Sequence, residues 1–263
     1  MVGMWTAITR DISASLADCE LSYVSRTPID MSLARQQHEG YRALLEASGC
    51  RVIALPPLEA HPDAVFVEDV AVVLDEVAVL TRPGAASRRG EGTSVATMLG
   101  AFRDLRAIEA PGTLDGGDVL RIGHAIFVGA SARSNAAGIA QLRDLVSGFG
   151  YTVQAVVTRD CLHLKSAVTQ VADDILLINP QWVDAEVFAG YRLLEIDPDE
   201  PHAANALRIG QGSGASVLHP QCFPRTQQRL ADAGIVVATL DVSELQKAEG
   251  ALTCCSLLVA TSS

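Results

Sequence analysis

The chain has 263 residues, 49% of them hydrophobic, and its 31 acidic and 20 basic side chains leave a net charge of -11. This hydrophobic content supports a substantial folded core and excludes an intrinsically disordered chain. The negative charge repels a phosphate backbone, so we expect no nucleic-acid partner, and it favours a cationic ligand.

The sequence predicts neither a targeting segment nor a membrane span. Residues 1–10 lack the apolar run of a signal peptide. Acids such as Glu68 and Asp69 interrupt the most hydrophobic region before it reaches the ~20 residues that span a bilayer. We therefore expect a cytoplasmic protein with reduced cysteines. Its six cysteines show no CxxC spacing, so neither a zinc ribbon nor a redox motif is predicted.

Five stretches of the chain share one pattern of predicted strands. Each has a short β-branched strand, a tight polar or Gly-rich turn, and a second apolar strand, which is the signature of a β-hairpin. The stretches are 65–81, 114–129, 161–179, 203–219 and the segment that begins at Leu252. The last has no return strand of its own, and we expect Trp5 to Thr9 to supply it.

Helices are predicted between these hairpins. Asp30 is a good N-cap for a helix that Gly49 ends, and Ser134 is the expected cap of a second helix, which runs to Phe149. A third helix is expected over 225–234, and a fourth, with a weaker pattern, over 87–102.

The alternation of helix and hairpin repeats about five times, with a period in the 40s. Repeats of this size are typical of arrays, solenoids and propellers, and pairing of the last strand with the first favours a closed ring. Because no linker composition interrupts the pattern, we expect a single α/β domain over residues 1–263.

Equivalent points of the five hairpins carry chemically useful side chains. They are Glu68 with Asp69, Asp115, His163, Asn205 and Cys254. In a ring of repeats, equivalent positions converge on the axis, which would bring a nucleophile, a base and several acids into one pocket.

Each of these residues also has an ordinary structural interpretation. A lone strand cysteine is usually a small buried hydrophobe, and a lone histidine is usually a core or surface group. The acids are harder to explain in this way, because burying an unpaired carboxylate costs several kcal/mol. A metal pair of Cys161 and His163 is a poor alternative, since no third or fourth ligand has zinc-like spacing. The glycines at 210, 212 and 214 do not match the dinucleotide-binding fingerprint, so we expect neither a metal nor an organic cofactor.

Five motifs, in order, resemble the dimethylarginine dimethylaminohydrolase (dimethylargininase) family. They are Pro62-Asp63-Ala64-Val65-Phe66-Val67-Glu68-Asp69, Thr81-Arg82-Pro83-Gly84-Ala85 with Ser87-Arg88-Arg89, Leu114-Asp115-Gly116-Gly117-Asp118, Leu162-His163-Leu164-Lys165 and Leu252-Thr253-Cys254-Cys255-Ser256. The resemblance extends over nearly the whole chain. It implies the pentein fold, an α/β propeller of five pseudo-symmetric units around an axis, in agreement with the repeat.

The resemblance also implies roles for individual residues. Cys254 matches the family's nucleophile, His163 its general acid/base, and Asp115 the carboxylate that orients the histidine, where some members have Glu. The implied substrate contacts are Asp69 and Glu68 at the guanidinium group, Arg88 and Arg133 at the α-carboxylate, and Asp63, the backbone carbonyl of Ala248 and a lid near Leu21 around the α-amino group.

The implied reaction is the hydrolysis of N-methylated arginine, a small cationic substrate, to citrulline and an alkylamine. We expect the protein to be a monomer or a homodimer. Arginine deiminases are the first alternative. Their sequences resemble a His-x-Asp pattern, in which the Asp clamps the other side of the guanidinium group. Here the sequence reads His163-Leu164-Lys165, and the missing acid leaves room for N-methyl groups. An amidinotransferase would need a second amine site, and a non-catalytic propeller gives no reason for cysteine, histidine and acids at equivalent points.

Overall fold

Five three-stranded sheets make up the framework of the computed structural model, which describes residues 4–261. The sheets are β15 (Leu257–Thr261), β1 (Met4–Arg10) and β2 (Cys50–Leu55); β3 (Ala71–Val73), β4 (Val77–Leu80) and β5 (Asp104–Ala107); β6 (Val119–Ile122), β7 (Ala125–Ala130) and β8 (Thr152–Val157); β9 (Val168–Gln170), β10 (Ile175–Ile178) and β11 (Arg192–Glu195); and β12 (Leu207–Ile209), β13 (Ser216–Pro220) and β14 (Val237–Leu240).

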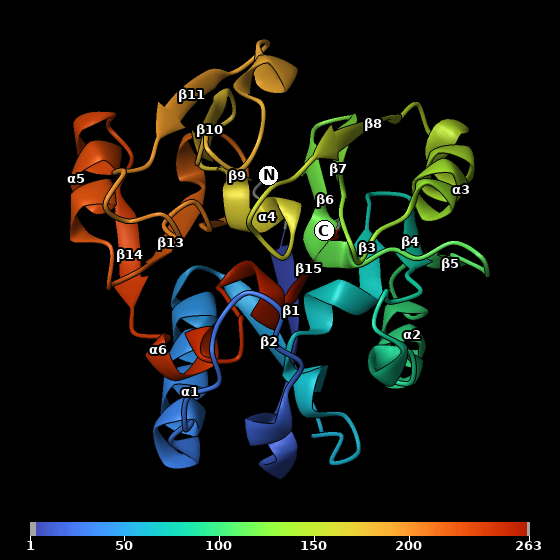
Figure 1. Cartoon of the computed structure of the whole chain (residues 1–263). Helices are drawn as coiled ribbons and strands as arrows, with labels where there is room; N and C mark the ends of the chain where they lie inside the picture. The colour runs from blue at the N-terminus through green and yellow to red at the C-terminus, as the bar shows by residue number, and fades with distance from the viewer. Residues whose placement is uncertain (1–3, 262–263) are drawn as a thin grey trace.

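All five sheets have the same connectivity. The first two strands of each sheet pair antiparallel, as a hairpin in four of the sheets, and a third strand runs parallel to the middle one. In the fifth sheet, β15 pairs with β1, so that Trp5 lies opposite Ala260 and Ile8 opposite Leu257. The predicted closure of the ring by the N-terminal strand is therefore confirmed. Figure 1 shows the five units around a common centre.

Helices connect the second and third strands of four units and lie at the periphery of the ring (Figure 1). They are α1 (Met31–Ala47), α2 (Gly92–Leu99), α3 (Ala136–Ser147) and α5 (Pro224–Asp232), whereas β10 and β11 are joined through a 3-10 turn, Ala185–Phe188. Two short helices, α4 (Leu164–Ala167) and α6 (Ser243–Gln246), complete the set. Within residues 4–261, no helix is both long and apolar enough to cross a membrane.

The predicted helix boundaries are partly right. The carboxylate of Asp30 caps α1 by accepting the N–H groups of Ser32 and Leu33, as predicted. The predicted cap of α3 is wrong, because Asn135 caps that helix and the Ser134 hydroxyl donates instead to buried Asp118. The prediction of a helix over 87–102 is also wrong in its first part, since a 3-10 turn and Glu91 precede α2.

The acids singled out in the sequence do not lie within strands, which corrects the predicted placement. Glu68 and Asp69 belong to a 3-10 turn, Val67–Val70, directly before β3, and Gly116–Asp118 forms a similar turn before β6. Another such turn, Thr253–Cys255, precedes β15. Turns of this kind leave backbone N–H groups free of the sheet, and these groups satisfy buried carboxylates: Gly117 N–H donates to Asp69 Oδ1 at 2.9 Å.

Candidate active site

The side chains predicted to carry chemistry come together around one small cavity. Its volume of about 20 Å³ holds a water molecule and little more. The residues in its wall are Glu20, Asp63, Phe66, Asp69, Arg88, Arg133, Leu162, His163, Ala248, Glu249 and Cys254.

His163 is buried in this wall and held by carboxylates on both ring nitrogens. Its Nε2 lies 3.1 Å from Asp115 Oδ2, and its Nδ1 lies 3.8 Å from Asp69 Oδ1. Asp115 is itself fixed, because its Oδ1 accepts the backbone N–H of Gly84 at 2.9 Å. Burial alone would lower the pKa of His163, but the charge of Asp69 and the hydrogen bond that the imidazole donates to Asp115 raise it to about 9. The imidazole is therefore protonated at neutral pH.

Asp69 is held in a network that keeps it ionised. Arg88 Nη1 donates to Asp69 Oδ2 at 2.6 Å, and Glu91 binds the Nε side of the same guanidinium. Burial would raise the pKa of Asp69, but the charges of His163 and Arg88 lower it to about 2. Arg88 Nη2 also donates to two backbone carbonyls, so this arginine is a structural anchor as well as part of the cavity wall.

Cys254 lies at the middle of the Thr253–Cys255 turn, and helix α1 holds this turn in place. The hydroxyl of fully buried Tyr41 donates to the carbonyl of Leu252 at 2.9 Å and lies 2.7 Å from Ser256 Oγ. Burial raises the pKa of the Cys254 thiol to about 12, with further increases from the charges of Glu68 and Asp69. In the free protein the thiol is therefore neutral at pH 7.

The glycine pair at 116–117 allows three units to approach one another at the site. A Cβ on Gly116 would lie 1.9 Å from the Glu68 carbonyl oxygen, and one on Gly117 would lie 2.5 Å from His163 Nδ1 and 2.8 Å from Asp69 Oδ1. Neither position has space for a side chain, which explains the Gly-Gly sequence between two acids.

Replacing Gly117 with alanine is expected to displace the His163 ring and lower the free energy of unfolding by about 1–3 kcal/mol, because buried groups must move to make room. Catalytic rate should fall together with stability. Gly148→Ala is the control, since a Cβ there meets nothing within 4 Å and the backbone has φ -65°. Thermal unfolding and turnover of both variants test this prediction, and a Gly117→Ala variant with wild-type stability and turnover would contradict it.

A metal ion has one candidate set of ligands in residues 4–261. Ligand atoms of Asp69, Asp115 and His163 lie within 4.8 Å of one another. The positive charge of Arg88, 2.6 Å from Asp69, opposes a divalent cation at this point. Cys161, the other metal ligand considered from the sequence, does not belong to this set, and its thiol donates to the His163 carbonyl at 3.4 Å.

Comparison with known proteins identifies the relatives of this chain. The profile of the family described as "N,N dimethylarginine dimethylhydrolase, eukaryotic" matches residues 22–260. The N(G),N(G)-dimethylarginine dimethylaminohydrolase of Streptomyces coelicolor is 38% identical over 252 residues, which cover 95% of each chain. The chain belongs to the dimethylarginine dimethylaminohydrolase family.

Solved structures of this family share the fold. A citrulline complex of the Pseudomonas aeruginosa enzyme, with a cysteine replaced by serine, has a TM-score of 0.88 at 32% identity and covers 97% of this chain and 99% of its own. A dimethylarginine dimethylaminohydrolase with a histidine replaced by glycine, in an adduct with S-methyl-L-thiocitrulline, has a TM-score of 0.90 at 32% identity, with 98% and 100% coverage. The predicted pentein α/β propeller is confirmed.

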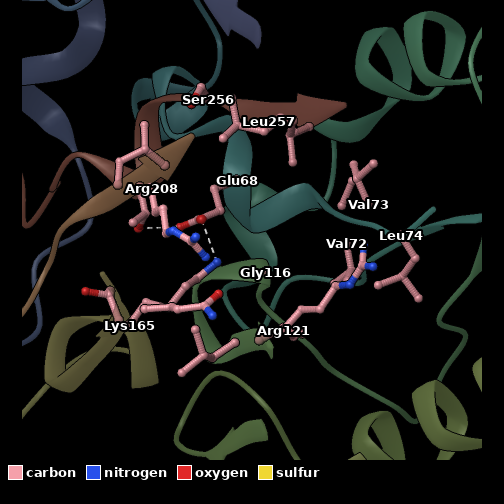
Figure 2. A pocket seen from close by; sticks show the side chains of 18 of the residues that line it. Glu68, Val72, Val73, Leu74, Gly116, Arg121, Lys165, Arg208, Ser256 and Leu257 are labelled. Carbon is pink, nitrogen blue, oxygen red and sulfur yellow. Dashed lines mark hydrogen bonds and ion pairs between the residues drawn. The ribbon is translucent and has the colours of Figure 1, made fainter. Parts of the chain in front are cut away.

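Three residues predicted from the family resemblance lie outside the cavity wall. Asp115 lies behind His163 and is fully buried. Leu21 does not line the cavity, whereas its neighbour Glu20 does. Glu68 faces a second cavity of about 250 Å³, where its Oε1 pairs with Lys165 Nζ at 2.5 Å (Figure 2). Its Oε2 accepts the hydroxyl of Thr253, the residue before Cys254, at 2.8 Å.

Glu20 and Glu249 in the cavity wall were not predicted from the sequence, and neither was the role of Asn205. The Asn205 side chain bonds Thr253 at both its backbone N–H and its hydroxyl, and it donates to the Lys165 carbonyl. The repeat placed Asn205 at the fourth equivalent position, which was a usable signal. Glu20 and Glu249 belong to no hairpin pattern, and no sequence signal marked them.

Proposed function

We propose that this chain hydrolyses N-methylated arginine to citrulline and an alkylamine through a covalent adduct on Cys254. The observation that carries the proposal is that Cys254, His163 and Asp69 line a single cavity, with Asp115 bonded to the histidine. The kinship with dimethylarginine dimethylaminohydrolases supports the same reaction. The substrate is accordingly a small cationic arginine derivative.

The reaction begins with a thiol and an imidazolium in the free protein. A guanidinium group bound against Asp69 brings a positive charge to Cys254, which lowers the thiol pKa and releases the proton to solvent. The thiolate then attacks the guanidinium carbon to give a tetrahedral adduct. His163 donates its proton to the departing alkylamine, and an S-alkylthiouronium remains on Cys254. The neutral imidazole activates water, which displaces the thiol and gives citrulline.

The rest of the substrate is placed by the other residues of the wall. Arg133 and the remaining N–H of Arg88 Nη1 are suited to the α-carboxylate, since both cations line the cavity. Asp63, the Ala248 carbonyl and the loop around Leu21 are proposed to surround the α-amino group. Glu68 lies outside this cavity and accepts a hydrogen bond from the Thr253 hydroxyl, so it positions the turn that carries Cys254.

An arginine deiminase is the alternative activity, and the position of Lys165 speaks against it. The side chain at this position, two residues after His163, is turned towards Glu68 and lines the second cavity (Figure 2). The guanidinium is therefore clamped by Asp69 without a second acid, which leaves a nitrogen free to carry methyl groups. An amidinotransferase or a non-catalytic propeller has no specific support from this site.

Wider properties of the protein remain predictions. We propose that residues 1–263 act as one catalytic unit, as a monomer or homodimer in the cytoplasm, without a metal or an organic cofactor.

A citrulline assay across arginine, monomethylarginine and the two dimethylarginines tests the proposed function. We expect citrulline from at least one methylated form, with little from arginine. Faster consumption of arginine than of every methylated form would favour the deiminase. No citrulline from any of the four would refute the proposal.

A further inference from the structure

Glu249 occupies an unusual backbone position beside the candidate active site. Its φ of 57° lies in the left-handed region, where residues other than glycine are uncommon. It follows Ala248, whose carbonyl is one of the proposed substrate contacts, and lies five residues before Cys254. A glutamate in this conformation projects its side chain into the wall of the cavity.

One carboxylate oxygen of Glu249 binds the loop of residues 19–26, whose Glu20 lines the cavity wall. Glu249 Oε1 accepts three consecutive backbone N–H groups: those of Ser22 at 2.9 Å, of Tyr23, and of Val24 at 2.8 Å. Three convergent N–H groups form a nest for an anion, and a charged acceptor strengthens each bond. The base of the same loop is held by Asp63, whose Oδ2 accepts Glu20 N–H at 3.1 Å.

The other oxygen, Oε2, is buried and has no hydrogen-bond partner among residues 4–261. A buried carboxylate oxygen without a donor is costly, and such atoms are rare in folded proteins. Because Glu249 lines the cavity, a ligand with N–H donors can supply the missing bond. The donor expected there is a cation.

The position of Arg133 indicates which end of the substrate lies beside Glu249. Arg133 Nη2 lies 3.3 Å from Ser22 Oγ, and the backbone N–H of the same serine is bound by Glu249. Arg133 and Glu249 therefore contact the same loop residue, so we expect a carboxylate bound by Arg133 to lie near Glu249. In an α-amino acid the carboxylate and the ammonium share one carbon atom, so the ammonium falls next to the free oxygen.

We propose that Glu249 binds the α-ammonium group of the substrate through Oε2 while its Oε1 latches the 19–26 loop closed. This inference rests on the proposed function for the identity of the substrate. The cavity of about 20 Å³ is too small for an arginine derivative, so the loop must open for entry. In the closed protein, the α-ammonium group supplies the hydrogen bond that Oε2 lacks and so stabilises the closed loop. A substrate without an α-amino group is therefore enclosed less efficiently.

A substrate-by-residue comparison tests the ammonium contact. We compare kcat/KM for methylated arginine with kcat/KM for its counterpart without the α-amino group, N-methylated 5-guanidinopentanoate. Both substrates are measured with the wild type, with Glu249→Gln and with the control Glu39→Gln, which changes an exposed acid on α1. Since a charge-assisted bond contributes about tenfold or more in affinity, the wild-type preference for the amino form should fall about tenfold in Glu249→Gln and stay unchanged in the control. Equal loss for both substrates would overturn the ammonium contact.

Hydrogen exchange of the free protein tests the latch without turnover. The amides of residues 22–24 should be protected in the wild type and exchange about tenfold faster in Glu249→Gln, because the neutral amide is a weaker acceptor. Unchanged protection would overturn the latch. If the wild type forms no citrulline from any methylated arginine, the proposed function fails, whereas citrulline formation with an unchanged substrate preference in Glu249→Gln refutes this inference alone.

Discussion

Replacing Cys254 with serine is expected to abolish citrulline release, with a loss of more than about 10³-fold, because a serine hydroxyl cannot match a thiolate as a nucleophile towards a guanidinium carbon. The variant should keep its fold, since the two side chains differ by one atom and the turn is held through Tyr41. It should also still bind substrate, because Asp69 and the two arginines are untouched. Turnover and ligand binding are measured side by side.

Cys222→Ser is the matched control for this substitution. Cys222 is exposed, and its thiol donates to Gln246 Oε1 at 3.7 Å, away from the candidate active site, so the same chemical change there should leave turnover unaltered. Cys255 is a poorer control, because it is buried next to the nucleophile and donates to the Ala251 carbonyl. Turnover of Cys254→Ser at the wild-type rate would show that another group carries the attack.

The repeat could be predicted because each unit begins with a hairpin whose strands are buried. Strands such as β4, β7 and β10 consist almost entirely of apolar side chains, so their pattern is visible in the sequence. The third strands of three units escaped prediction for the opposite reason. Every residue of β5 is exposed, and β8 and β11 are largely at the surface, which removes the apolar alternation that marks a strand.

The catalytic candidates could be predicted because they recur at equivalent positions of the repeat, and the motif resemblance then separated Cys254 from Cys255. The N-cap of α3 could not be predicted, because Ser134 and Asn135 are both good N-caps. Buried Asp118 accepts the Ser134 hydroxyl, which leaves Asn135 to cap the helix. Glu249 was invisible for a further reason. Its partners, residues 22–24, are more than 220 positions away and present only backbone N–H groups, which leave no trace in side-chain identity.

Replacing His163 with glutamine is expected to lower kcat for methylated arginine by about 10²–10⁴-fold, because the alkylamine then leaves without a proton donor. The pH profile should change as well. Below pH 9 the free wild-type protein carries a proton on both Cys254 and His163, whereas the reactive form carries only one. The wild-type kcat/KM should therefore rise about tenfold per pH unit towards pH 9 and level off above it. In His163→Gln the break near pH 9 should disappear.

S-Methyl-L-thiocitrulline separates the role of His163 as a proton donor from a merely structural one. Its leaving group is methanethiolate, which departs without prior protonation and takes its proton from solvent. The first step should therefore survive in His163→Gln, while the second, which needs a base to activate water, should not. A covalent adduct on Cys254 should then accumulate and be visible by mass spectrometry. If the folded variant formed no adduct, His163 would have a structural role beyond proton donation. Citrulline release from both substrates at wild-type rates would exclude His163 from proton transfer.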